Sequence, residues 1–220
     1  KEVKVRAVKA ELTALESQIK PHFIYNTLDV INWKAVEYDL PELEKLVYTL
    51  SQFFKFSLKN KGSVVPISME AGHIKTYIDL HNMKNVDKIE SEIDLDNVEN
   101  YYLPKITLQP IVENAMIHGI LNKKQKTGTI KIWAEEYGDL IKIMIQDDGV
   151  GMSEAKLSLI NDTKLVNTGV GISNVRERLR LCFGENYGVH YESTPGKGTI
   201  ATITIPKLTK DNMDDFFVVY

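Results

Sequence analysis

The chain has 220 residues, of which 43% are hydrophobic and 26% charged, a composition that excludes disordered and collagen-like chains. Its 27 Lys and Arg against 30 Asp and Glu give a net charge of −3, so it has no overall positive field and nucleic acid is not expected as a partner. The single cysteine, Cys182, excludes an intrachain disulfide framework and favours a reducing, cytoplasmic compartment.

The first element is a helix with a heptad-like apolar stripe. Apolar residues recur at spacings of three and four, and the series runs Val5, Val8, Leu12, Leu15, Ile19 and then His22. The stripe fits a short coiled coil or a helix packed on its own domain. We expect this helix to continue through Pro21, which bends or loosens it just before His22. No stretch of the chain approaches the roughly 20 apolar residues that span a bilayer.

Two more helices and then a region of strands follow. The pattern predicts a helix that opens at Pro41 and another that is capped by Ser68, before the period changes to two near Lys88. Strands are predicted at 89–93, 129–134, 140–146 and 198–205, with helices at 108–118 and 172–183. The sequence therefore predicts an α+β fold: a helical domain, residues 1–86, and an α/β-sandwich domain, residues 87–220, with a mixed sheet and helices on one face.

Three polar segments of the second half have the residue types of a ligand site. Asn114 and His118 are four residues apart on an otherwise apolar helix. Asp147 leaves an apolar strand directly before a glycine pair, and a second glycine pair opens the helix near residue 172, where backbone amides can receive phosphate. Each segment alone is more typical of a solvated face or a plain turn, and their order along one chain gives them weight.

This ordered set resembles the Asn box and the two glycine boxes of the ATP-binding fold shared by histidine kinases, gyrase, Hsp90 and MutL. Within that superfamily, the segments at 21–28, 103–104 and 108–119 resemble the LytS/YehU-like sensor histidine kinases. The resemblance covers the chain from about residue 16 to residue 206.

The resemblance implies an ATP site with Mg²⁺. It makes Asn114 the Mg²⁺ ligand, Asp147 the acceptor of the adenine amino group, and Thr199 its support, whereas Glu113 would orient water or assist the acceptor. The remaining expected nucleotide contacts are His118, with Gly149 and Gly151 in the first glycine loop and Gly169 and Gly171 in the second. Residues 152–168, between the loops, would form either an ATP lid or an ordinary connector.

The resemblance also makes His22 the phosphoacceptor, for which a neutral imidazole offers a nitrogen lone pair near pH 7. The position after it is Phe23, where many other histidine kinases have an acidic residue. Asn26, one helical turn later, is the nearest group that could orient the ring, as could Gln18 one turn earlier.

The expected function is the cytoplasmic kinase core of a two-component sensor. The resemblance implies a homodimer, a response regulator as phosphoryl acceptor, and a membrane sensor region upstream, with no membrane contact by these residues. The alternatives are an ATPase or protein serine kinase of the same superfamily, and a degenerate scaffold that only dimerises.

Overall fold

A computed structural model describes residues 21–58, 64–162 and 170–213, and the chain divides into two compact units between Lys61 and Gly62. The expected division was at residue 86. The structure places the helix of residues 67–84 in the second unit, because its buried face belongs to the core of that unit. None of the described helices combines the length and the apolar composition of a membrane-spanning segment.

The first unit contains two helices, α2 (Pro21–Glu37) and α3 (Pro41–Leu58), joined by a turn at 38–40. α3 begins at Pro41 as predicted, with Glu42 and Glu44 in its first turn, where acidic side chains favour the helix dipole. Leu28, Ala35 and Val47 are buried in this unit. The predicted apolar stripe before Pro21 lies outside the described residues.

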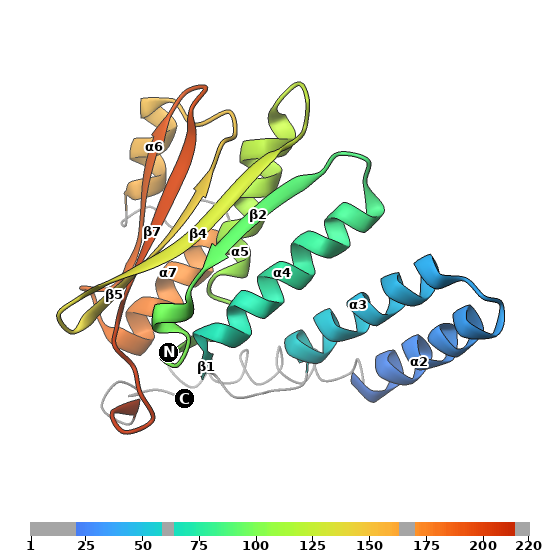
Figure 1. Ribbon diagram of the computed structural model, residues 1–220. Helices are drawn as coiled ribbons and strands as arrows, with labels where there is room; N and C mark the ends of the chain where they lie inside the picture. Colours follow the sequence, from blue (N-terminus) through green and yellow to red (C-terminus); the bar gives the residue numbers. More distant parts are fainter. Residues whose placement is uncertain (1–20, 59–63, 163–169, 214–220) are drawn as a thin grey trace, which may run out of the picture. The chain divides into compact units, whose positions relative to one another are not determined.

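The second unit is built on a mixed five-stranded sheet (Figure 1). The strands in spatial order are β2 (Ile89–Asp94), β4 (Gly128–Tyr137), β5 (Leu140–Asp147), β7 (Gly198–Pro206) and β6 (Gly188–Thr194). β2 and β4 are parallel, and the other neighbouring pairs are antiparallel. Two short strands, β1 (Val64–Pro66) and β3 (Tyr102–Pro104), pair separately. The predicted mixed sheet is confirmed.

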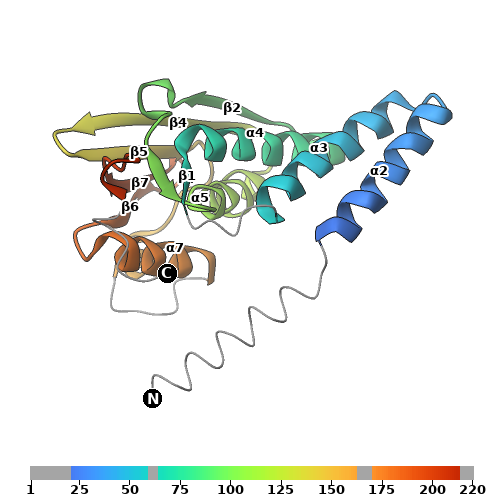
Figure 2. The same ribbon diagram turned by 90° about the horizontal axis from the view of Figure 1, so that it is seen from below.

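Helices cover one face of this sheet (Figure 2). They are α4 (Ile67–Lys84), α5 (Gln109–Asn114), which continues as the π-turn η2 (Ala115–Gly119), and α7 (Val170–Phe183). Along β5, Ile141, Ile143 and Ile145 are buried, and they alternate with half-buried Lys142 and Gln146. This period of two places one strand face against the helices, as the sequence predicted.

Several local features differ from the predictions. Pro66, not Ser68, is the residue before α4, and no side chain caps that helix. The expected continuous helix at 108–118 changes from α to π at Ala115 and ends in the 3₁₀ turn η3 (Ile120–Asn122). The helix α6 (Glu154–Asn161) was not predicted, nor were β1, β3, β6 and the 3₁₀ turn η1 (Asp96–Val98).

Candidate functional site

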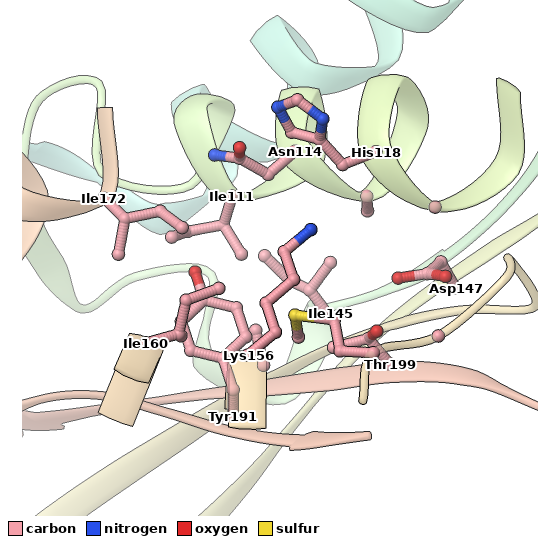
Figure 3. A pocket seen from close by; sticks show the side chains of 15 residues that line it. Ile111, Asn114, His118, Ile145, Asp147, Lys156, Ile160, Ile172, Tyr191 and Thr199 are labelled. Atoms are coloured by element: carbon pink, nitrogen blue, oxygen red, sulfur yellow. The ribbon is translucent and has the colours of Figure 1, made fainter. Parts of the chain in front are cut away.

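A cavity of about 260 Å³ lies in the second unit and is lined by residues of β5, β7, α5, η2, α6 and α7, among others (Figure 3). Ile111, Ile145, Ile160 and Ile172 form much of its wall. These four side chains come from separate elements that meet in the apolar core. The cavity therefore offers apolar surface on several sides, which suits a flat ring system.

Asp147 is the buried acid of the cavity. It ends β5, and its side chain is only 3% exposed. Burial raises the pKa of the carboxyl to about 6, the amide of Gly149 opposes this, and the neighbouring Asp148 adds to it. The Gly149 N–H donates to Oδ1 of Asp147 at 2.8 Å. At pH 7 the group is mostly ionised and can accept a hydrogen bond from a guest in the cavity.

The backbone around Asp147 is too close for side chains. A Cβ on Gly149 would lie 2.3 Å from the backbone carbon of Gly119, and one on Gly119 would lie 2.6 Å from Oδ1 of Asp147. Gly151 has a φ of 67°, and a Cβ there would meet the carbonyl oxygen of Thr194 at 2.1 Å. Glycine at 149 and 151 is therefore required by close approach and by a left-handed backbone.

Thr199 is placed opposite Asp147 by the antiparallel pairing of β5 and β7. Its hydroxyl lies 2.9 Å from that of Ser193, which donates to the carbonyl of Gly198 at 2.8 Å and accepts from the amide of Met152 at 2.9 Å. Since Ser193 has one proton and has already donated it, the Thr199 hydroxyl donates to Ser193. The Thr199 oxygen keeps lone pairs that can accept in the cavity.

Asn114 and His118 reach the same cavity from the helix above the sheet. The amide nitrogen of Asn114 donates to the carbonyl of Pro110 at 2.6 Å, which leaves its amide oxygen as a hard ligand. No group of three or more His, Cys, Asp or Glu in the described residues could hold a metal ion by itself. The oriented amide oxygen of Asn114 is a ligand type that Mg²⁺ accepts when phosphates and waters supply the other positions.

Glu113 does not line the cavity. Its carboxylate accepts from Gln109 Nε2 at 3.4 Å and lies beside Tyr77 of α4, whose pKa is raised by burial and by this carboxylate. The side chain is thus held at the interface of α4 and α5, one residue before Asn114. Any effect of Glu113 on a guest passes through the helix or through water.

The second glycine pair is only partly described. Gly171 lies in the first turn of α7, where a Cβ would be 4.0 Å from Nδ2 of Asn114, an ordinary contact distance. Gly169 lies outside the described residues. The structure therefore brings Gly171 and Asn114 together without showing that a glycine is required at 171.

Lys156 is a residue that the sequence analysis missed. It extends from α6 into the cavity, and among the described residues that line this cavity it has the one lysine or arginine side chain (Figure 3). Ser153 caps α6 by accepting from the Lys156 amide at 3.4 Å. A serine followed by glutamate is a helix-start signal that could have located α6, but not the direction of this side chain.

The described part of the expected lid is anchored. Asn161, at the end of α6, accepts from the amide of Tyr191 at 2.9 Å and donates to its carbonyl at 2.7 Å. Arg176 of α7 donates to the carbonyl of Ile160. α6 is therefore fixed to β6 and α7, and the rest of the expected lid, residues 163–168, lies outside the described residues.

In the first unit, His22 and Asn26 lie on one exposed face of α2. Nδ2 of Asn26 lies 3.2 Å from Nδ1 of His22. An amide N–H in this position donates to a ring nitrogen, so the proton of a neutral ring is then on Nε2. Turning the amide group over would present its oxygen, hold the proton on Nδ1 and expose the Nε2 lone pair.

Two family models together match most of the chain. Residues 10–89 match the model described as "Histidine kinase", and residues 103–209 match "Histidine kinase-, DNA gyrase B-, and HSP90-like ATPase". The chain therefore belongs to the sensor histidine kinases and forms a kinase core with their ATPase-type domain.

Individual relatives agree with this assignment. The chain is 35% identical over 199 residues to the sensor histidine kinase YesM of Bacillus subtilis, a match that covers 90% of this chain and 33% of YesM. It is 29% identical over 203 residues to the sensor protein LytS of Bacillus anthracis, covering 90% of this chain and 34% of LytS. The predicted resemblance to LytS-type sensors is confirmed, and the chain spans about a third of the length of the curated relatives it matches.

Solved structures support the fold. The histidine kinase domain from the blue-light activated histidine kinase of Erythrobacter litoralis EL346 aligns with a TM-score of 0.52 at 16% identity, covering 96% of this chain and 97% of that one. The catalytic domain of the histidine kinase ThkA aligns with a TM-score of 0.51 at 17% identity, covering 67% of this chain and 97% of that one. The predicted α+β class is confirmed.

Proposed function

We propose that this chain transfers the γ-phosphoryl group of ATP to His22. The observation that carries the proposal is the apolar cavity in which a buried carboxylate, Asp147, and an oriented amide oxygen, that of Asn114, are presented together. The cavity and the Asp147 carboxylate suit a purine ring with an amino group, and the Asn114 oxygen suits a cation bound to phosphates.

Adenine would lie against the isoleucine walls, with its amino group donating to Asp147 and with Thr199 as a neighbouring acceptor. The phosphates would extend toward Asn114, His118 and Gly171, where Lys156 supplies positive charge. Mg²⁺ held by Asn114 neutralises phosphate charge when it is bound. Catalysis of this kind depends on alignment and on charge compensation, because the protein forms few bonds itself.

The reaction forms a bond from an imidazole nitrogen of His22 to the γ-phosphorus and breaks the bond from that phosphorus to the β–γ bridging oxygen, which leaves with ADP. The attacking nitrogen needs a lone pair, so the proton of the neutral ring must be on the other nitrogen. Asn26 is the group in contact with Nδ1, and we assign it to control which nitrogen holds the proton. Glu113 would assist from the second unit through water.

Dimerisation and phosphorelay complete the proposal. α2 exposes Phe23 by 70% and Trp33 by 75%, and two helices alone cannot cover such faces, whereas a four-helix bundle of two chains can. We assign residues 1–86 to dimerisation and phosphotransfer and residues 87–220 to ATP binding, so that the functional boundary lies within the second compact unit. The phosphoryl group would then pass from His22 to a response regulator.

We also propose that these residues are a cytoplasmic portion of a sensor with a membrane-embedded region elsewhere. ATP is available in the cytoplasm, and YesM, of which the chain matches 33%, is a sensor histidine kinase. The proposal predicts that full-length protein fractionates with membranes, whereas recovery in the soluble fraction would contradict it.

The kinase proposal is tested by incubating the chain with γ-labelled ATP and Mg²⁺. Phosphohistidine is labile to acid and stable to alkali, so the label should be lost in acid and kept in alkali. An acid-stable label would support the protein serine kinase alternative, release of phosphate without label would support the ATPase, and absence of both with ATP unbound would support the scaffold.

A further inference from the structure

The loop of residues 105–108 leads directly into α5 and has an unfavourable backbone. Ile106 has a φ of 58°, a left-handed conformation that β-branched residues rarely adopt. α5 also has no cap of its own, because Leu108 precedes it and makes no side-chain cap hydrogen bond. Contacts from elsewhere must therefore hold this loop in place.

Glu70 of α4 holds the loop from one side. Its Oε1 accepts from the amide of Ile106 at 2.6 Å, and its Oε2 accepts from the amides of Thr107 at 3.0 Å and Leu108 at 2.9 Å. The side chain has no exposed surface. One carboxylate on α4 thus caps the start of the helix that carries Asn114, although the two lie more than 30 residues apart in the sequence.

Arg178 of α7 holds the same loop through its carbonyl groups. Its Nη1 donates to the carbonyl of Lys105, and to that of Ile106 at 3.1 Å. Burial raises the pKa of Glu70, whereas the three amides and the charge of Arg178 oppose that rise. The peptide groups around Ile106 are therefore bound at their N–H groups by one helix and at their carbonyls by another.

The position of the loop is passed directly to the Asn114 side chain. Pro110 is two residues beyond Leu108, and its carbonyl accepts from the Asn114 amide nitrogen at 2.6 Å. A shift of the loop therefore moves the group that orients the Asn114 oxygen. Asp147 lies on β5 and makes no hydrogen bond to the loop among those described. It touches the α5–η2 segment at Gly119, the end of that segment farthest from the loop. We therefore expect the clamp formed by Glu70 and Arg178 to act on Asp147 less directly than on Asn114.

We infer that Glu70 and Arg178 are positioning residues of the nucleotide site, which fix the loop before α5 and thereby aim the Asn114 oxygen at the phosphate-bound cation. This inference rests on the proposed role of Asn114. It separates the two ends of the nucleotide: the clamp governs the phosphate end, whereas Asp147 governs the base.

The test compares Mg·ATP and adenosine as ligands of the whole chain. In Glu70→Gln the amide has one acceptor oxygen, so at least one of the three loop amides loses its partner. We expect Mg·ATP affinity to fall about 10-fold by calorimetry, with adenosine affinity changed by less than about 2-fold. Arg178→Gln should show the same selective loss. Asp79→Asn, a change of an exposed carboxylate on the same helix, should affect neither ligand.

The outcomes separate the inference from the function on which it rests. Wild-type affinity for Mg·ATP in both clamp variants, or an equal loss for both ligands in folded protein, would overturn the positioning role. If Glu70→Gln does not give a cooperative thermal transition, Arg178→Gln decides by the same criterion. Failure of the wild-type chain to bind Mg·ATP at all would instead overturn the proposed function.

Discussion

Replacing Asp147 with asparagine tests the base-recognition end of the site, because it keeps the shape and changes the hydrogen-bonding character. In the wild type, Oδ1 accepts from the Gly149 amide at 2.8 Å. An NH₂ group cannot accept from that N–H, so the oxygen of the asparagine stays there and its nitrogen takes the other position. In the variant, a donor therefore replaces the acceptor of the adenine amino group.

The expected loss follows from the charge of the acceptor. A hydrogen bond to a charged group contributes about 1.5–3 kcal/mol, so adenosine affinity should fall about 10- to 100-fold in Asp147→Asn. Inosine has a carbonyl where adenosine has the amino group, and the new donor suits that carbonyl. The preference for adenosine over inosine should therefore decrease or reverse.

The pH dependence gives a second, independent check of the same group. With a pKa of about 6, the carboxyl becomes protonated as the pH falls through 6 and loses its charged acceptor. Adenosine affinity should be level above about pH 7 and should fall at pH 5 to about a tenth of that level. Adenosine is the ligand of choice because ATP phosphates titrate in the same range. Asp147→Asn should show no such change between pH 5 and pH 7.

The folding stability should change in the opposite direction from binding. The pKa of Asp147 in the folded protein is raised above the ordinary value, so its contribution to the free energy of unfolding is greatest at low pH and is lost as the pH rises through about 6. Asp147→Asn should therefore be at least as stable as the wild type at pH 7. Calorimetric titrations with adenosine and inosine measure the change in binding, and thermal unfolding measures the change in stability. Unchanged adenosine affinity in a folded variant would refute the assignment of the base pocket.

Substitutions at three further positions test the phosphate end and the acceptor. Asn114→Ala should weaken Mg·ATP about 10-fold or more while leaving adenosine affinity nearly unchanged, and an equal loss for both ligands by calorimetry would contradict the cation-ligand role. Lys156→Gln should lower ATP affinity by about 2- to 10-fold more than it lowers adenosine affinity, and this difference should shrink at high salt. A difference that does not depend on salt would argue against a contact between Lys156 and the phosphates. Asn26→Ala should slow labelling of His22 about 10-fold or more without affecting nucleotide binding. Asn26→Asp should restore the labelling rate, because a carboxylate keeps the ring proton on Nδ1. Equal labelling rates in the two variants would show that Asn26 does not control which ring nitrogen holds the proton.

The main strands could be predicted from the sequence because their side chains alternate strongly. Leu140 to Gln146 has an apolar residue at every second position, and the structure buries that face. β1 and β3 were missed because each has three residues, and their pairing joins Val64 to Pro104 across 40 positions. The cap of α4 was wrong because Pro66 already fixes an extended backbone, so the helix begins before Ser68 could cap it.

The candidate site residues could be selected from motif order, but their mutual geometry could not. The sequence shows Asp147 and Thr199 far apart, and only the register of β5 with β7 makes them partners. Gly119 was not selected, since its role depends on contact with Asp147 and Gly149 in the fold. Glu70 carries no local signal at all, because a buried carboxylate that binds amides 36 to 38 residues away looks in the sequence like an ordinary helical glutamate.

One paired measurement decides whether ATP bound in the second unit phosphorylates His22. Wild-type chain and His22→Gln are incubated with Mg²⁺ and γ-labelled ATP at equal, calorimetrically verified nucleotide occupancy, and acid-labile label is counted per chain. We expect the same affinity for Mg·ATP in both proteins, label on the wild type, and none on His22→Gln. Label on His22→Gln at the wild-type level, with the same acid lability, would contradict it.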